Sequence, residues 1–309
     1  METVQKRGWM KRKTKRTLFF WFMAALPLLQ FAIFYVYVNF NNIVLAFQKY
    51  ELNESYTFDV SFTLGNFATA WNVIAEKNYF ITNSLIKFVV LMVIQYPLAL
   101  IFSNYIYKKW PASGFFKTVL FMPQLVSGLI YGLLFKYMVS DVYIALNPAS
   151  LGGLLDLNDL STARFTVLIY ACLMGFGVNV LLFSGSMSGI NESVVESAQL
   201  DGVNIVQEFW YITVPMIWPT IVQLVVVSVS AIFTDQMNLM TFYGSKADEL
   251  STLGYYMYFQ AAWSDVVPKN KTFLSYTELA AMSLMVTLVV FPLTLFVRKA
   301  MNKFGPSMD

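Results

Sequence analysis

The chain lacks histidine, contains one cysteine and carries few charged side chains. Of its 309 residues, 57% are hydrophobic and 13% are charged, and the mean hydropathy is +0.57. Because soluble domains carry about 25% charged residues, this composition argues against one and indicates a polytopic membrane protein. Without histidine the chain lacks the commonest general base and metal ligand, and Cys172 alone cannot form an intrachain disulfide. We therefore expect no catalytic constellation and no metal site.

Six long apolar runs predict six transmembrane helices, because a helix needs about 20 residues to cross the hydrocarbon core of a bilayer. The expected spans are Leu18–Asn39, Ser84–Tyr107, Thr118–Val139, Phe165–Met187, Ile217–Leu239 and Leu279–Val297. Prolines inside these runs do not argue against helices, since neighbouring helices satisfy the backbone groups that proline frees. The predicted fold class is all-α, a polytopic membrane protein.

Basic residues predict the orientation of the spans. Lysine and arginine gather in three segments, residues 1–17, 108–117 and 298–303, which lie on one side of the membrane if there are six spans. The positive-inside rule places that side in the cytoplasm, together with both termini and the loop 189–215. We take residues 1–17 as a basic cytoplasmic N-terminus, which also favours contact with anionic lipid, and residues 18–309 as one transmembrane domain.

The loop 189–215 is the exception, because it is acidic and contains no lysine or arginine. Asn191 is a good N-cap for a short helix, and Asp201-Gly202 predicts a turn. Beyond the turn, Ile205, Phe209 and Ile212 form an apolar stripe at helical spacing. We expect a helix–turn–helix hairpin on the cytoplasmic surface whose apolar stripe is covered by a partner.

The same loop resembles the conserved cytoplasmic loop of permease subunits of binding-protein-dependent ABC importers. That motif reads Glu-Ala-Ala, three residues, Gly, nine residues, Ile-x-x-Pro. The matching positions here are Glu196, Ser197, Ala198, Gly202, Ile212 and Pro215, and Asp201 and Phe209 match the form found in sugar permeases. Ser197 and Val214 depart from the motif conservatively.

The resemblance extends along the chain to sugar permeases of the maltose/glycerol-phosphate type, and more closely to the lipoprotein-associated, polysaccharide-uptake branch. The segments that carry it are 39–48, 65–67, 83–84, 251–258 and 276–281. One departure is 241–245, where many sugar permeases have Thr-x-Gly-Gly-Pro and this chain reads Thr-Phe-Tyr-Gly-Ser.

This resemblance implies a type I ABC importer permease fold in the bacterial cytoplasmic membrane, forming half of a sugar translocation pathway. It implies a second, homologous permease as heterodimer partner, two cytoplasmic ATPases and an extracellular solute-binding protein, and no nucleic acid. ATP and Mg²⁺ would be bound by the ATPases, since the chain has no Gly-x-x-x-x-Gly-Lys-Ser/Thr phosphate loop. The residues implied in ATPase coupling are Glu192, Glu196, Ser197, Ala198, Asp201, Gly202, Phe209, Ile212 and Pro215.

Polar residues within spans are expensive and tend to face a cavity or another helix, so they are candidates for contact with cargo. The substrate-pathway candidates are Tyr131, Asn179, Gln223, Asp235, Gln236 and Asn238. Two structural alternatives stay open. Asp235 could form an ion pair with Lys87 or Lys136, and Gln95 and Gln223 could bond across helices.

Three other functions are weighed against a sugar permease. An ABC permease for a non-sugar solute would share every feature except the sugar-type Asp201 and Phe209. A secondary transporter or channel would favour intramembrane carboxylate pairs, broken helices or an internal repeat, whereas Asp235 is the single acid that we place in a span. An intramembrane enzyme would need a nucleophile–base or metal set that we do not find.

Overall fold

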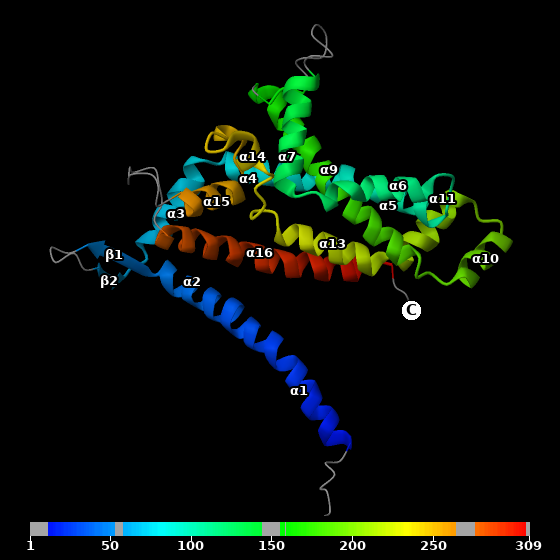
Figure 1. Cartoon of the computed structure of the whole chain (residues 1–309), viewed down its shortest axis with the longest axis horizontal. Helices are drawn as coiled ribbons and strands as arrows, with labels where there is room; N and C mark the ends of the chain where they lie inside the picture. Colours follow the sequence, from blue (N-terminus) through cyan, green and yellow to red (C-terminus); the bar gives the residue numbers. More distant parts are fainter. Residues whose placement is uncertain (1–11, 53–57, 144–154, 158, 264–275, 307–309) are drawn as a thin grey trace, which may run out of the picture.

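The computed structural model describes residues 12–52, 58–143, 155–157, 159–263 and 276–306, and these are mostly helical (Figure 1). Short stretches of π- or 3-10 helix are labelled η. The elements in chain order are α1 Arg12–Phe31, η1 Ala32–Tyr37, α2 Val38–Ala46, β1 Gln48–Leu52, β2 Phe58–Phe62, α3 Gly65–Glu76, α4 Tyr79–Val90, η2 Leu91–Gln95, α5 Tyr96–Tyr107, α6 Ser113–Phe121, η3 Met122–Leu125, α7 Gly128–Tyr137, η4 Met138–Tyr143, α9 Leu160–Met187, α10 Glu192–Leu200, α11 Ile205–Glu208, η5 Phe209–Thr213, α12 Val214–Met216, α13 Trp218–Ser230, α14 Leu239–Tyr243, η6 Asp248–Leu250, α15 Leu253–Trp263 and α16 Tyr276–Phe304.

Four of the six expected spans correspond to helices that are long and apolar enough to cross a membrane. These are Lys13–Ala46, Tyr79–Tyr107, Thr162–Met187 and Tyr276–Phe304. The first of them runs without a break from α1 through η1 into α2, and its α1 end projects away from the other helices (Figure 1). Most of these helices extend several residues beyond the predicted boundaries.

The third expected span is bent rather than straight, and the fifth is bent against the segment that precedes it. Ser113–Leu125 and Gly128–Tyr143 meet at 104°, and Ile205–Met216 and Trp218–Ser230 meet at 67°. The second bend precedes Pro219, whose missing N–H interrupts the helical ladder. The described chain therefore holds six spans only if each bent pair counts as one.

The predicted end of the fifth span at Leu239 is wrong. The helix α13 stops at Ser230, and residues 231–238 form an irregular turn. Met237 and Asn238 have left-handed φ angles of 53° and 55°, a conformation through which a right-handed helix cannot continue.

The all-α prediction missed a short antiparallel hairpin that follows the first helix. Strands β1 and β2 pair from Gln48↔Phe62 to Leu52↔Phe58. The buried Asn66 of α3 holds this hairpin, since its Nδ2 donates to the carbonyl oxygens of Ala46 (3.0 Å) and Gln48 (2.9 Å).

The helices pack in two sets. The helix α9 packs on α5 and α6, and α16 packs on α2, α3 and α13. The hairpin of α10 and α11 and the C-terminal end of α16 lie at one end of the long helices, whereas α3, α14 and α15 lie at the other (Figure 1).

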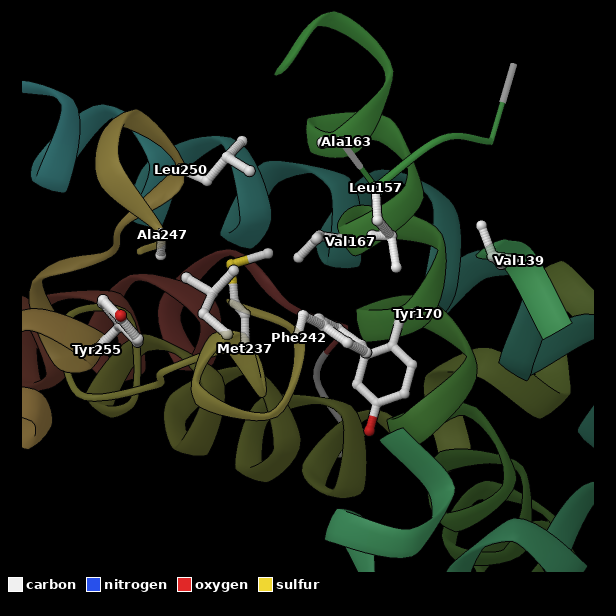
Figure 2. Packing of buried hydrophobic residues seen from close by; sticks show 11 residues of the cluster. Val139, Leu157, Ala163, Val167, Tyr170, Met237, Phe242, Ala247, Leu250 and Tyr255 are labelled. Carbon is white, nitrogen blue, oxygen red and sulfur yellow. The ribbon is translucent and has the colours of Figure 1, made fainter. Parts of the chain in front are cut away.

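A buried cluster joins α9 to the turn 231–238 and to α14 and α15 (Figure 2). Tyr170 and Phe242 form an edge-to-face pair at its centre, with ring centroids 4.8 Å apart. Burial raises the pKa of the neighbouring Tyr243 to about 12. Its hydroxyl therefore stays protonated at physiological pH and donates to the carbonyl oxygen of Leu157 (2.9 Å).

Gly177 sets the close crossing of α9 and α6, because a Cβ there would overlap the backbone of Leu120. We expect Gly177→Ala to destabilise the protein by about 1–3 kcal/mol through overpacking and to lower its midpoint of thermal unfolding in detergent. Gly185→Ala on the same helix is the control, because a Cβ at that exposed position meets nothing within 4 Å. Equal midpoints for the two variants would contradict the close crossing.

Candidate functional site

A cavity of ≈ 530 Å³ lies between the helix Tyr79–Tyr107, α9, α13 and the turn 231–238. Four of the six predicted substrate-pathway residues line it: Asn179, Asp235, Gln236 and Asn238. Its other polar lining residues are Lys87, Gln95, Tyr96, Tyr170 and Ser228. The remaining wall is apolar. The cavity therefore combines an apolar surface with several amide and hydroxyl groups and one ion pair.

Two predicted residues lie outside this cavity. Tyr131 is half-buried behind the wall, where its ring packs on Tyr170 with centroids 5.8 Å apart. Gln223 is exposed on α13 and does not line the cavity. Tyr131 thus supports the wall through Tyr170, whereas Gln223 faces away from the cavity.

The ion pair in the cavity joins Lys87 of α4 to Asp235 of the turn. This was one of the two structural alternatives for Asp235. The other partner, Lys136, donates instead to the carbonyl oxygen of Phe242 (2.7 Å). Since Asp235 both pairs with Lys87 and lines the cavity, the ion pair and a role at the cavity are compatible.

Amide groups join the second and fourth expected spans across the cavity wall. Gln95 Nε2 donates to the carbonyl oxygen of Cys172 (2.6 Å), and Asn179 Nδ2 donates to Gln95 Oε1 at 3.4 Å. The alternative of a bond across helices therefore holds for Gln95, which is buried.

The turn 231–238 is held by its neighbours in a strained conformation. Asp235 Oδ1 accepts from the backbone N–H of Met237 (2.7 Å), and Asn238 Nδ2 donates to the carbonyl oxygen of Gly128 (2.9 Å) and to the hydroxyl of Tyr170. A left-handed non-glycine residue costs on the order of 1–3 kcal/mol and persists where surrounding contacts determine it. The wall of the cavity that carries Asp235, Gln236 and Asn238 is therefore fixed in place.

The predicted hairpin forms as two short helices. Asn191 caps α10 by accepting from the N–H of Ser193 (3.1 Å), and Asn204 forms a capping box with Gln207 at the start of α11. Gly202 joins the two with φ of +81°, a conformation that favours glycine. Exposed positions of the motif are Glu192, Glu196, Ser197, Asp201 and Gly202, whereas Ala198 is buried.

The expected apolar stripe of Ile205, Phe209 and Ile212 is not fully exposed, so only part of it is available to a partner. Phe209 is 8% exposed and packs inside the chain, in a cluster with Ile106, Phe183 and Met187. Ile212 and Pro215 are half-buried in the bent segment that leads to α13. The expectation that a partner covers Phe209 is therefore corrected, because buried residues of this same chain cover it.

An ion pair that the sequence did not suggest anchors the hairpin. The carboxylate of Glu208, 3% exposed, pairs with the ammonium of Lys108, which directly follows α5. The two residues are 100 positions apart, so no local pattern indicates the contact. Together with Phe209, this pair joins the surface hairpin to the helix whose other half lines the cavity.

Comparison with known proteins places this arrangement in a family. Residues 95–309 match the family described as "Binding-protein-dependent transport system inner membrane component". The chain belongs to this family of transport permeases. It is therefore an inner-membrane component of a transport system rather than an enzyme.

Individual relatives of the chain are also permease proteins of transport systems. The chain is 28% identical over 205 residues to the lactose transport system permease protein LacF of Rhizobium radiobacter, covering 63% of this chain and 68% of that protein. It is 26% identical over 248 residues to the multiple sugar-binding transport system permease protein MsmF of Streptococcus mutans, covering 79% of each. It is 30% identical over 119 residues to the arabinooligosaccharides transport system permease protein AraP of Halalkalibacterium halodurans, covering 37% of this chain and 38% of that protein.

The fold also matches solved structures. A bacterial ABC transporter involved in the import of the acidic polysaccharide alginate superposes with a TM-score of 0.74 at 18% identity, covering 95% of this chain and 98% of that one. The alginate transporter in complex with a periplasmic protein bound to an alginate pentasaccharide superposes with a TM-score of 0.72 at 17% identity. The match covers 93% of this chain and 94% of that one. These likenesses establish the fold.

Because Phe209 is buried within the chain, we expect Phe209→Ala to destabilise the subunit itself, by on the order of 3 kcal/mol. The midpoint of thermal unfolding of the purified protein should fall. Trp210→Ala is the matched control, since Trp210 is the adjacent aromatic and is 57% exposed. An unchanged midpoint for Phe209→Ala would contradict the buried placement.

Proposed function

We propose that the chain is the permease subunit of an ATP-driven importer of oligosaccharides and that the cavity lies on the path of the cargo. The cavity itself carries this proposal. Sugars are bound by aromatic faces together with amide and carboxylate hydrogen bonds, and the lining supplies both kinds of group, from Tyr96 and Tyr170 to Asn179, Gln236 and Asn238.

The relatives support a carbohydrate cargo, because their names refer to lactose, arabinooligosaccharides and multiple sugars. Their matched stretches span from 38% to 79% of each relative's length. The named sugars include uncharged ones, whereas the structural neighbour is an importer of acidic alginate. The fold therefore does not determine the charge of the cargo, which depends on the side chains of the cavity.

The chain would form half of the pathway, with a second, homologous permease as the other half. Two cytoplasmic ATPases would hold ATP and Mg²⁺, and an extracellular solute-binding protein would deliver the sugar. The hairpin is the docking element for the ATPase, since Glu196 and Ser197 are exposed while Phe209 and Glu208 join it to the helices. Closure of the ATPases would then move the helices as a rigid-body switch. In this proposal the hairpin and both termini lie in the bacterial cytoplasm.

A charge reversal on the hairpin tests the docking. We expect Glu196→Lys to reduce recovery of the ATPase at least tenfold when the subunit is purified from membranes in mild detergent, because it places a cation in the docking face. Glu76→Lys is the control, since Glu76 is also an exposed helical glutamate but lies on α3, at the opposite end of the molecule (Figure 1). Partners are identified by mass spectrometry and the thermal midpoints of both variants are compared.

The wild-type purification in the same experiment tests the proposed function as a whole. Recovery of a second permease, an ATPase and a solute-binding protein is the expected result. Recovery of the chain alone as a stable homo-oligomer without an ATPase would overturn the importer and reopen the channel or secondary-transporter interpretation.

A further inference from the structure

The cavity carries one ion pair in a lining that is otherwise uncharged. Apart from tyrosines, Lys87 and Asp235 are the ionisable side chains among the described residues that line it, and they pair with each other. The remaining polar groups are amides and hydroxyls. The net charge of the lining is therefore zero.

The two charges are not equally accessible. The side chain of Lys87 is 10% exposed, whereas that of Asp235 is 42% exposed. Asp235 is also fixed, because its second carboxylate oxygen accepts from the N–H of Met237 and its carbonyl oxygen accepts from the hydroxyl of Thr252 (2.9 Å). A molecule that enters the cavity thus contacts the carboxylate of Asp235 more readily than the ammonium of Lys87, which is largely buried.

We propose that the Lys87–Asp235 ion pair makes the cavity selective for uncharged oligosaccharides against uronate-containing ones. This inference rests on the proposed function and adds the charge class of the cargo. A neutral sugar donates hydroxyl hydrogens to the free lone pairs of Asp235 and to the surrounding amide oxygens. A uronate brings a second carboxylate to the same surface, where it is repelled by Asp235 and cannot reach Lys87 without displacing Asp235.

The pair also keeps Lys87 from acting as an anion site. If Asp235 were an amide, the ammonium would be the one formal charge among the described residues that line a partly desolvated cavity, where charge interactions are stronger than in water. An anionic sugar would then neutralise it. The selectivity therefore depends on Asp235 as the accessible partner, and removing its charge should reverse the preference.

The test uses the purified complex with its partner permease and ATPase, without the solute-binding protein, so that the cavity alone selects. Binding of maltotetraose and of tetragalacturonate, two tetrasaccharides with the same linkage pattern, is measured by saturation-transfer NMR at millimolar concentration. In the wild type we expect maltotetraose to bind at least tenfold more tightly than tetragalacturonate. In Asp235→Asn we expect that ratio to fall at least tenfold.

Asp141→Asn is the matched control, because it makes the same chemical change on η4, outside the cavity, and should leave the ratio unchanged. If the Asp235→Asn variant fails to assemble, the same binding ratio is measured on the charge-reversed double variant, Lys87→Asp with Asp235→Lys. It keeps an ion pair but turns the ammonium toward the cavity, so tetragalacturonate should become the preferred ligand.

Equal binding of the two sugars by the wild type, or a ratio that Asp235→Asn and the charge-reversed pair leave unchanged, would overturn the inference while the oligosaccharide importer stands. Binding of neither sugar would also overturn it. The proposed function fails separately, through the absence of ATPase and permease partners in the purification described above.

Discussion

The helix Tyr79–Tyr107 is tied at both ends to the segment that contains α13, and the positions of the cavity and the hairpin both depend on this. Near one end Lys87 pairs with Asp235, which follows α13, and just beyond the other end Lys108 pairs with Glu208, which precedes it. Between them the hydroxyl of Tyr96 bonds to the backbone and side chain of α13. The hairpin and the cavity are therefore connected through two elements that are joined along their length.

The cavity exists because α13 stops early. Irregular backbone at membrane depth is tolerated where it is buried in protein or lines a cavity, and the turn 231–238 does both. Two of its polar groups bond to other elements: the side-chain amide of Asn238 donates to the carbonyl oxygen of Gly128, and the carbonyl oxygen of Asp235 accepts from the hydroxyl of Thr252. Because Gly254 has no side chain, α15 packs in close contact with the backbone at Thr234. The shape of the cavity is thus determined by the packing around a broken helix.

The parts that the sequence predicted are those with a strong local pattern. Apolar runs located four spans as helices, and Asn191, Gly202 and the flanking residues located the hairpin. The bends were not predicted, and the burial of Phe209 was missed because it depends on contacts between residues far apart in the chain. The motif identified Phe209 as important, but a periodic stripe does not tell which surface covers it. Polar residues in apolar runs located four cavity residues, whereas Lys87 entered only as a partner for Asp235.

The ion pair of Lys87 and Asp235 has a consequence for synthesis of the protein. Lys87 emerges from the ribosome roughly 150 residues before Asp235, which at about 5–20 residues per second corresponds to a delay on the order of ten seconds. During that interval the helix Tyr79–Tyr107 carries, near one end, an ammonium without its partner, and a lysine near a helix end reaches toward the membrane interface. The ion pair itself can therefore form only after the fifth span has been made, when the helix that carries Lys87 has long been synthesised.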